Sequence, residues 1–221
     1  MCYSAEASFI ASGVLIATSV AIARTPKEHG SLPLAAIPAI FATHQFIEGC
    51  IWLSQDEPGL GSLETAAITL YVLIAYVLWP IYIPFAAYRM ETCPKRRIAI
   101  LLCQAVGLAV GVNYLVGMIQ TPVAVSVYTC NLSYQVASIW NLGPAYLIAV
   151  TVPLLISSRK GLVLFGVGVV ASCAAGLYLE QMPSFPSVWC FFAAVLSISL
   201  LAYFKAAQRQ VVSQRQVSAS I

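Results

Sequence analysis

Seven long apolar stretches alternate with short polar segments and occupy almost the whole 221-residue chain. A helix rises about 1.5 Å per residue, so about 20 mostly apolar residues can cross the hydrocarbon core of a bilayer. The pattern therefore predicts an all-α, polytopic membrane protein with seven transmembrane helices. We expect them at about residues 7–24, 33–54, 64–88, 98–119, 139–157, 161–180 and 186–204.

The composition excludes a soluble domain of useful size. The chain is 60% hydrophobic and only 9% charged, with a mean hydropathy of +0.87, which lies far outside the range of soluble proteins. Residues 1–204 are thus expected to form a single seven-helix transmembrane domain. Residues 205–221 are rich in Gln and Ser and are expected to form a polar cytoplasmic tail without regular structure.

The distribution of charge predicts how the helices are oriented. All eleven Lys and Arg residues fall in four places, and six of the eight acids are expected on the opposite side of the membrane. Basic loops remain in the cytoplasm, so the N-terminus should lie outside and the C-terminus inside the cell (inner) membrane. The basic residues are Arg24 and Lys27, then Arg89, Lys95, Arg96 and Arg97, then Arg159 and Lys160, and finally Lys205, Arg209 and Arg215.

This distribution also bears on the partners of the protein. The net charge of +3 is spread over loops as a topology signal, which gives no indication of a nucleic-acid partner. The expected partners are the lipid bilayer and a small ligand or metal ion. Association with further copies of the chain, or with another membrane subunit, is left open.

Two features outside the charged loops predict the shape of the bundle. The longest loop, residues 120–138, carries no charge and is expected to pack over the outer mouth of the bundle. Pro80 and Pro84 should kink the third helix, and Pro144 and Pro153 the fifth, because proline cannot donate the backbone hydrogen bond of a helix. Such kinks expose carbonyl groups and can shape a cavity.

The second helix carries an ionisable pair at membrane depth. His44 and Glu48 are four residues apart and share one helical face, which Trp52 continues outward. A charged side chain in the bilayer costs about 2.5–3.5 kcal/mol on insertion scales, so such groups usually face a bundle interior or a watery cavity. The pair therefore indicates an inward-facing site, although Trp52 is also compatible with an interfacial aromatic belt.

Two further carboxylates are predicted at the same outer level. Glu6 begins the first helix and Glu180 ends the sixth, so both could converge with His44 and Glu48 in an outward-opening pocket. One imidazole with several carboxylates favours Fe, Mn or Zn over a thiolate-bound metal. The predicted metal ligands are therefore His44, Glu48, Glu6 and Glu180.

Alternatives to a metal site remain open. His44 and Glu48 could form a buried hydrogen-bonded couple that only orients helices, or they could relay protons. Glu64, at the start of the third helix, is better explained as an acid favoured by the helix dipole.

The cysteine pattern does not match a zinc motif. The seven cysteines have no C-x-x-C spacing, and four of them should lie towards the oxidising outer face. A disulfide is feasible there, and Cys2–Cys130 is one geometric possibility. The four outer cysteines are Cys2, Cys50, Cys130 and Cys190.

Three segments carry a resemblance to a known family. The opening Met-Cys-Tyr-Ser-Ala-Glu, the block His44-Gln45-Phe46-Ile47-Glu48-Gly49 with Trp52, and the block from Ser187 to Ala194 resemble an uncharacterised family of bacterial membrane proteins that begin Met-Cys-Phe-Ser-Ala. The family is a domain of unknown function, so the resemblance supports the architecture and implies no activity. It implies that Cys2, Glu6, His44, Glu48 and Cys190 belong to one unit. The predicted ligand-binding residues are therefore Glu6, His44, Glu48, Glu180, Trp52 and Cys190.

Two function classes follow from these residues. The first is a binding protein whose outward pocket holds a metal ion or a small cationic ligand, for sensing or transport. The second is a membrane-embedded, metal-dependent enzyme in which His44 and Glu48 act on an amphiphilic substrate. The absence of a nucleophile with an adjacent base favours the first.

Overall fold

The computed structural model describes residues 4–56, 61–128, 131–179 and 185–219, and these are mostly helical. Within these residues, six helices are long and apolar enough to cross a membrane, which is typical of an all-α membrane protein. The described elements are α1 (Ala5–Ala23), α2 (Leu32–Asp56), α3 (Gly61–Val72), the π-helix η1 (Leu73–Leu78), α4 (Trp79–Met90), α5 (Pro94–Gln120), β1 (Ala124–Tyr128), β2 (Asn131–Gln135), α6 (Gly143–Leu155), α7 (Lys160–Leu179), α8 (Phe185–Ser197) and α9 (Ser199–Ala219).

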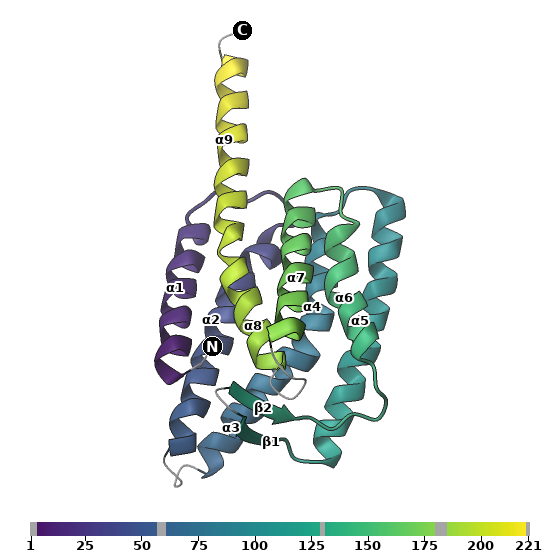
Figure 1. Ribbon diagram of the computed structural model, residues 1–221. Helices are drawn as coiled ribbons and strands as arrows, with labels where there is room; N and C mark the ends of the chain where they lie inside the picture. Colours follow the sequence, from purple (N-terminus) through teal and green to yellow (C-terminus); the bar gives the residue numbers. More distant parts are fainter. Residues whose placement is uncertain (1–3, 57–60, 129–130, 180–184, 220–221) are drawn as a thin grey trace.

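The helices run side by side as a bundle, with the β1–β2 hairpin at one end and the second half of α9 projecting from the other (Figure 1). The loops α1–α2, α4–α5 and α6–α7 lie at the end from which α9 projects. The third predicted span corresponds to α3, η1 and α4 in succession, and the seventh to α8 followed by α9.

Three sequence-based expectations differ from the structure. The fifth predicted span, 139–157, contains only the 13-residue helix α6, which is shorter than a typical spanning helix. The tail is helical rather than irregular, because α9 continues to Ala219. Residues 124–135 include an antiparallel hairpin, in which Val125 pairs with Tyr134, so the fold is not purely helical.

Proline positions explain the irregular centre of the α3–α4 span. Trp79 donates its N–H to the carbonyl of Ile74, five residues earlier, and the next such bond would run from Pro80 to Ala75. Pro80 has no N–H, so the Ala75 carbonyl is left without this donor. The hydroxyl of Tyr146 on α6 donates to it instead, at 2.6 Å. The expected role of proline in freeing a carbonyl is thus confirmed in this span.

A second proline brings α5 close to the same span. Pro84 cannot donate to the carbonyl of Pro80, and Gly107 of α5 packs directly against that carbonyl. A side-chain carbon at Gly107 would overlap the oxygen. The glycine is therefore required by the close approach of two backbones.

Buried residues form two clusters of apolar side chains. The larger one joins α1, α2 and α4–α9 around residues such as Leu15, Phe41 and Trp79. The smaller one lies at the hairpin end, where Leu132 and Tyr134 of β2 pack on Ile51 of α2 and Tyr71 of α3. The β2 strand of the uncharged 120–138 segment thus packs against one end of the bundle, and its expected place on the outer side stays a prediction. The candidate site lies in this smaller cluster.

Candidate functional site: a buried carboxylate beside an aromatic cavity

Glu48 is the centre of the candidate site. Its side chain is only 2% exposed, and three elements supply hydrogen-bond donors to its carboxylate. Gln45 on α2 donates from Nε2 at 3.1 Å, and the hydroxyl of Tyr71 on α3 donates at 3.2 Å. The hydroxyl of Ser187 on α8 donates to the same carboxylate oxygen as Tyr71. Neutral donors thus replace the water that a carboxylate would otherwise bind.

No basic side chain in the described part of the chain neutralises this carboxylate. Among the residues that the structure describes, one salt bridge is found, between Arg159 and Glu28 on the surface, and Glu48 takes part in none. A buried carboxylate that has hydrogen bonds but no counter-charge is energetically costly when ionised. Such a group favours the approach of a proton or of a cationic ligand.

His44 lies one turn away and binds the neighbouring helix. Its Nε2 is 3.1 Å from the carbonyl oxygen of Tyr71, and its ring stacks on the Tyr71 ring with 4.0 Å between centroids. A carbonyl oxygen only accepts, so Nε2 carries the hydrogen. Nδ1 is buried and has no partner among the described residues. His44 and Glu48 therefore connect through Tyr71 rather than bonding to each other.

The hairpin covers this group of side chains. Tyr134 of β2 stacks on Tyr71, with 4.4 Å between ring centroids and 14° between ring planes. The Tyr134 hydroxyl and the Oδ1 of Asn131 are buried without a partner in the described part of the chain. Burial, and secondly the nearby charge of Glu48, raise the pKa of the Tyr134 phenol well above its usual value. Tyr134 thus remains neutral over the physiological range.

An aromatic cavity of about 460 Å³ adjoins this group. Cys190 lines the cavity and packs with Tyr71 and Tyr134 in the same buried cluster. Tyr76 and Tyr114 face each other across 4.7 Å between ring centroids. The lining is completed by rings and a few polar groups, including Tyr146, Trp189, Phe185 and Asn141. A mostly apolar hollow with a few hydroxyl and amide groups is the usual form of a small-ligand site.

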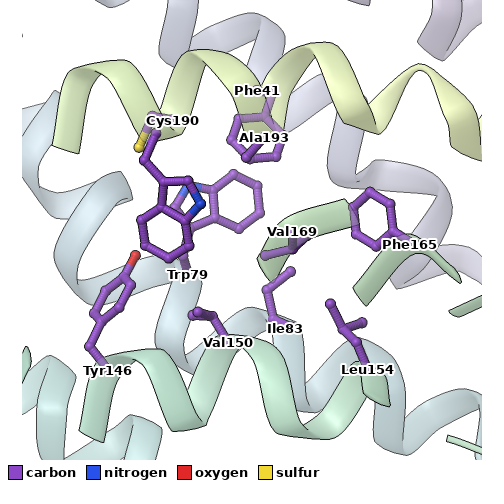
Figure 2. Close-up of a pocket in the computed structure, with 11 residues that line it drawn as sticks. Phe41, Trp79, Ile83, Tyr146, Val150, Leu154, Phe165, Val169, Cys190 and Ala193 are labelled. Carbon is purple, nitrogen blue, oxygen red and sulfur yellow. The ribbon is translucent and has the colours of Figure 1, made fainter. Parts of the chain in front are cut away.

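A narrower cavity of about 40 Å³ lies deeper in the bundle and is apolar along its walls. Figure 2 shows Cys190 and Tyr146 at one end of it, and Phe165 and Leu154 at the other, with Trp79 and Phe41 between. Tyr146, Trp189 and Cys190 line both cavities. The two hollows therefore share a wall at this point.

A comparison with known protein families shows which family the chain belongs to. The profile of the Family of unknown function (DUF6629) matches residues 1–216. The chain belongs to this family. No curated protein and no solved structure matches it. The resemblance to an uncharacterised family is confirmed, and it assigns no activity.

The family member brings together some, but not all, of the residues predicted from its sequence. His44, Glu48 and Cys190 are buried near one another at the hairpin end. Trp52 is half-buried, and its indole N–H has no partner among the residues that the structure describes. Glu6 is exposed in the first turn of α1, where Ser4 caps the helix. Glu180 lies outside the described residues.

The other acids and cysteines have separate roles. Glu64 accepts a hydrogen bond from Gln55 at 2.8 Å. Cys50 and Cys190 are free thiols, whereas Cys2 and Cys130 lie outside the described residues, as would the disulfide considered for them.

The predicted metal centre receives no support from the described residues. No group of three or more His, Cys, Asp or Glu side chains in that part of the chain could hold a metal ion. His44 turns its Nε2 toward a backbone carbonyl, and Glu48 is surrounded by hydroxyl and amide donors. The family member thus presents one carboxylate in a neutral, aromatic environment.

Sequence reasoning missed the residues that surround Glu48. Gln45 and Ser187 stand in segments already noted for their resemblance to the family, but a single polar residue in such a segment gives no sign of its partner. Tyr71 and Tyr134 are aromatic residues in apolar surroundings, where a packing role is the usual one. The alternation in Ala124-Val125-Ser126-Val127 was a usable signal for a strand.

Proposed function

We propose that this family member is a seven-span protein of the cell membrane, with its N-terminus outside, that binds a small organic cation in the aromatic cavity beside Glu48. Binding would serve sensing or transport. The single observation that carries the proposal is the buried Glu48 carboxylate, which has no basic partner in the described structure and bonds to Tyr71, in the same buried cluster as the cavity residue Cys190.

The proposed orientation is supported by where the basic loops lie. Arg159, between α6 and α7, bonds to Glu28 of the α1–α2 loop at 3.1 Å. Arg96, at the start of α5, donates to the carbonyl of Ile156 at 3.1 Å. The basic loops thus meet at one end of the bundle, opposite the hairpin, as the positive-inside bias requires for a cytoplasmic face (Figure 1).

A reporter fused after Ile221 tests this orientation. We expect a cytoplasmic signal, because seven passes with the N-terminus outside place the C-terminus in the cytoplasm. The count of seven requires the short helix α6 to cross the membrane. A second reporter in the 120–138 loop, before α6, should therefore read periplasmic. A periplasmic signal from the C-terminal fusion would contradict seven spans.

Aromatic rings and a carboxylate together select an organic cation. The face of a tyrosine or tryptophan ring attracts a cation with about 0.5–2 kcal/mol, and more when water is excluded. A quaternary or alkylated ammonium group suits a cavity of about 460 Å³ with few hydrogen-bonding groups better than a hydrated metal ion does. This environment also disfavours the metal-dependent enzyme considered from the sequence.

Calorimetric titration of the purified protein tests the ligand class. The probe is benzyltrimethylammonium, and its uncharged counterpart of the same shape is neopentylbenzene. We expect the cation to bind at least about tenfold more tightly, since only the cation is attracted by the ring faces and by the nearby charge of Glu48. Equal affinity for the two compounds, or no binding of either, would rule out the proposal.

Two variants locate the site in the same experiment. Tyr76→Leu should weaken binding of the cation by about 2-fold to 30-fold, because it removes one ring of the cavity wall. Glu48→Gln should weaken it by about tenfold or more, because the amide keeps a hydrogen-bond acceptor but removes the charge. Tyr178→Leu is the control, since Tyr178 is 89% exposed and lines neither cavity.

A further inference from the structure

A third hollow lies at the opposite end of the molecule, away from Glu48. It is a groove of about 730 Å³ between the first turns of α7 and the α8–α9 segment. Its walls are mostly apolar and include Leu164, Val167, Leu196 and Leu200. These helices belong to candidate membrane spans, and Leu164 and Val167 are exposed, so in a bilayer this wall would lie beside the acyl chains.

Charged groups gather at one end of this groove. Arg159 and Lys160 line it together with the single carboxylate of Glu28, so the groove carries a net positive charge of one. Arg159 is paired with Glu28. Lys160 is exposed and forms no salt bridge with any described residue. The ammonium group of Lys160 is therefore available to bind an anion from outside the protein.

The backbone at this end adds further donors. Lys160 is the first residue of α7, and the N–H groups of Lys160 and Gly161 have no acceptor within their own helix. Gly161 also lets the ring of Tyr203 lie directly against α7, where a side-chain carbon would overlap that ring. The helix start, the lysine and the tyrosine thus face one small region at the mouth of the groove.

We propose that this groove binds an anionic phospholipid, with the phosphate at Lys160 and the first turn of α7, and an acyl chain along the apolar wall. Charge complementarity selects an anion, and the length of apolar wall selects one that carries a hydrocarbon chain. Basic pockets between transmembrane helices at the cytoplasmic side are known to suit such headgroups. The inference uses the orientation proposed above but not the ligand cavity beside Glu48.

Native mass spectrometry of the full chain tests this proposal. Detergent-solubilised protein is mixed with phosphatidylglycerol or with phosphatidylcholine of the same acyl chains, and retained lipid is counted. We expect preferential retention of phosphatidylglycerol. Lys160→Gln should lower that retention about fivefold, which corresponds to about 1 kcal/mol for one basic residue near the headgroup. Lys95→Gln is the matched control, because Lys95 is exposed at the same end but does not line the groove.

The alternative occupants give different results. Equal retention of the two lipids, or unchanged retention in Lys160→Gln, would overturn the proposal. Full displacement of the lipid by glycerol phosphate at equal concentration would indicate an anion site with no role for the acyl chain. A dimer without bound lipid would assign the groove to a second copy. None of these outcomes depends on whether benzyltrimethylammonium binds.

Discussion

Glu91→Ala should lower the free energy of unfolding by about 3 kcal/mol, because it removes a carboxylate that joins two loops. Glu91 is 3% exposed and accepts from the backbone N–H groups of Thr92 and Cys93, at 3.0 and 2.9 Å. It also accepts from the N–H of Ser158 at 2.7 Å and from the hydroxyls of Ser157 and Ser158. Unfolding followed by circular dichroism in mixed micelles of increasing denaturing detergent measures the loss.

The same carboxylate predicts a dependence of stability on pH. Burial alone would raise the pKa of Glu91, but the hydrogen bonds from Ser158, Cys93 and Thr92 outweigh it and lower the pKa to about 2. The ionised form is thus favoured in the folded state, so its stabilisation is fully present above the ordinary glutamate pKa of 4.5. It should be lost as the pH falls from about 4.5 towards 2, and this loss should be absent in Glu91→Ala.

Glu28→Ala is the control for this prediction. Glu28 lies at the same end of the bundle, and its salt bridge with Arg159 is formed by side chains that are each 37% exposed. Exposed salt bridges contribute about 0–1 kcal/mol. If Glu28→Ala and Glu91→Ala destabilised the protein equally, the loop-joining role of Glu91 would be wrong.

Gly107→Ala should destabilise the protein by about 3 kcal/mol, because the new methyl group would overlap a backbone carbonyl. The carbonyl belongs to Pro80 on the neighbouring span, and it cannot move aside as a flexible side chain could. The two helices must separate, which also disturbs the contact of Gln104 with the Ile81 carbonyl at 3.0 Å. The same detergent titration measures this effect.

Gly13→Ala is the matched control for Gly107→Ala. Gly13 lies in α1, and a side-chain carbon there would meet nothing within 4 Å. Alanine is favoured over glycine inside a helix by about 1 kcal/mol, so Gly13→Ala should leave stability unchanged or raise it. A loss of stability in Gly13→Ala as large as in Gly107→Ala would show that glycine is needed for some reason other than the close approach to Pro80.

Much of the architecture could be predicted because it follows from local composition. The length of each apolar stretch matches the thickness of a bilayer, and the clusters of Lys and Arg mark loops between the stretches. Both signals lie within single segments of the chain. The apolar stretches predicted the long helices. The 13-residue α6 differs, because the apolar stretch 139–157 is longer than the helix that it forms.

The candidate site was only partly predictable. The spacing of His44 and Glu48 on one helix indicated a shared, inward face, and the structure buries both side chains there. The expected convergence of Glu6 with this pair did not occur, because Glu6 lies on the exposed face of α1. Helical periodicity says which residues share a face, but it does not say which neighbouring helix that face meets.

The sequence by itself determined the membrane class, the approximate positions of the long helices, and the burial of an ionisable pair in the second of them. Only the tertiary structure decided that Tyr71 separates His44 from Glu48, that Ser187 reaches the carboxylate from 139 positions away, and that a hairpin covers the group. Helix length and amphipathic spacing are set by near neighbours in the chain. Hydrogen bonds between helices depend on the rotation and depth of each helix, which packing of the whole bundle determines.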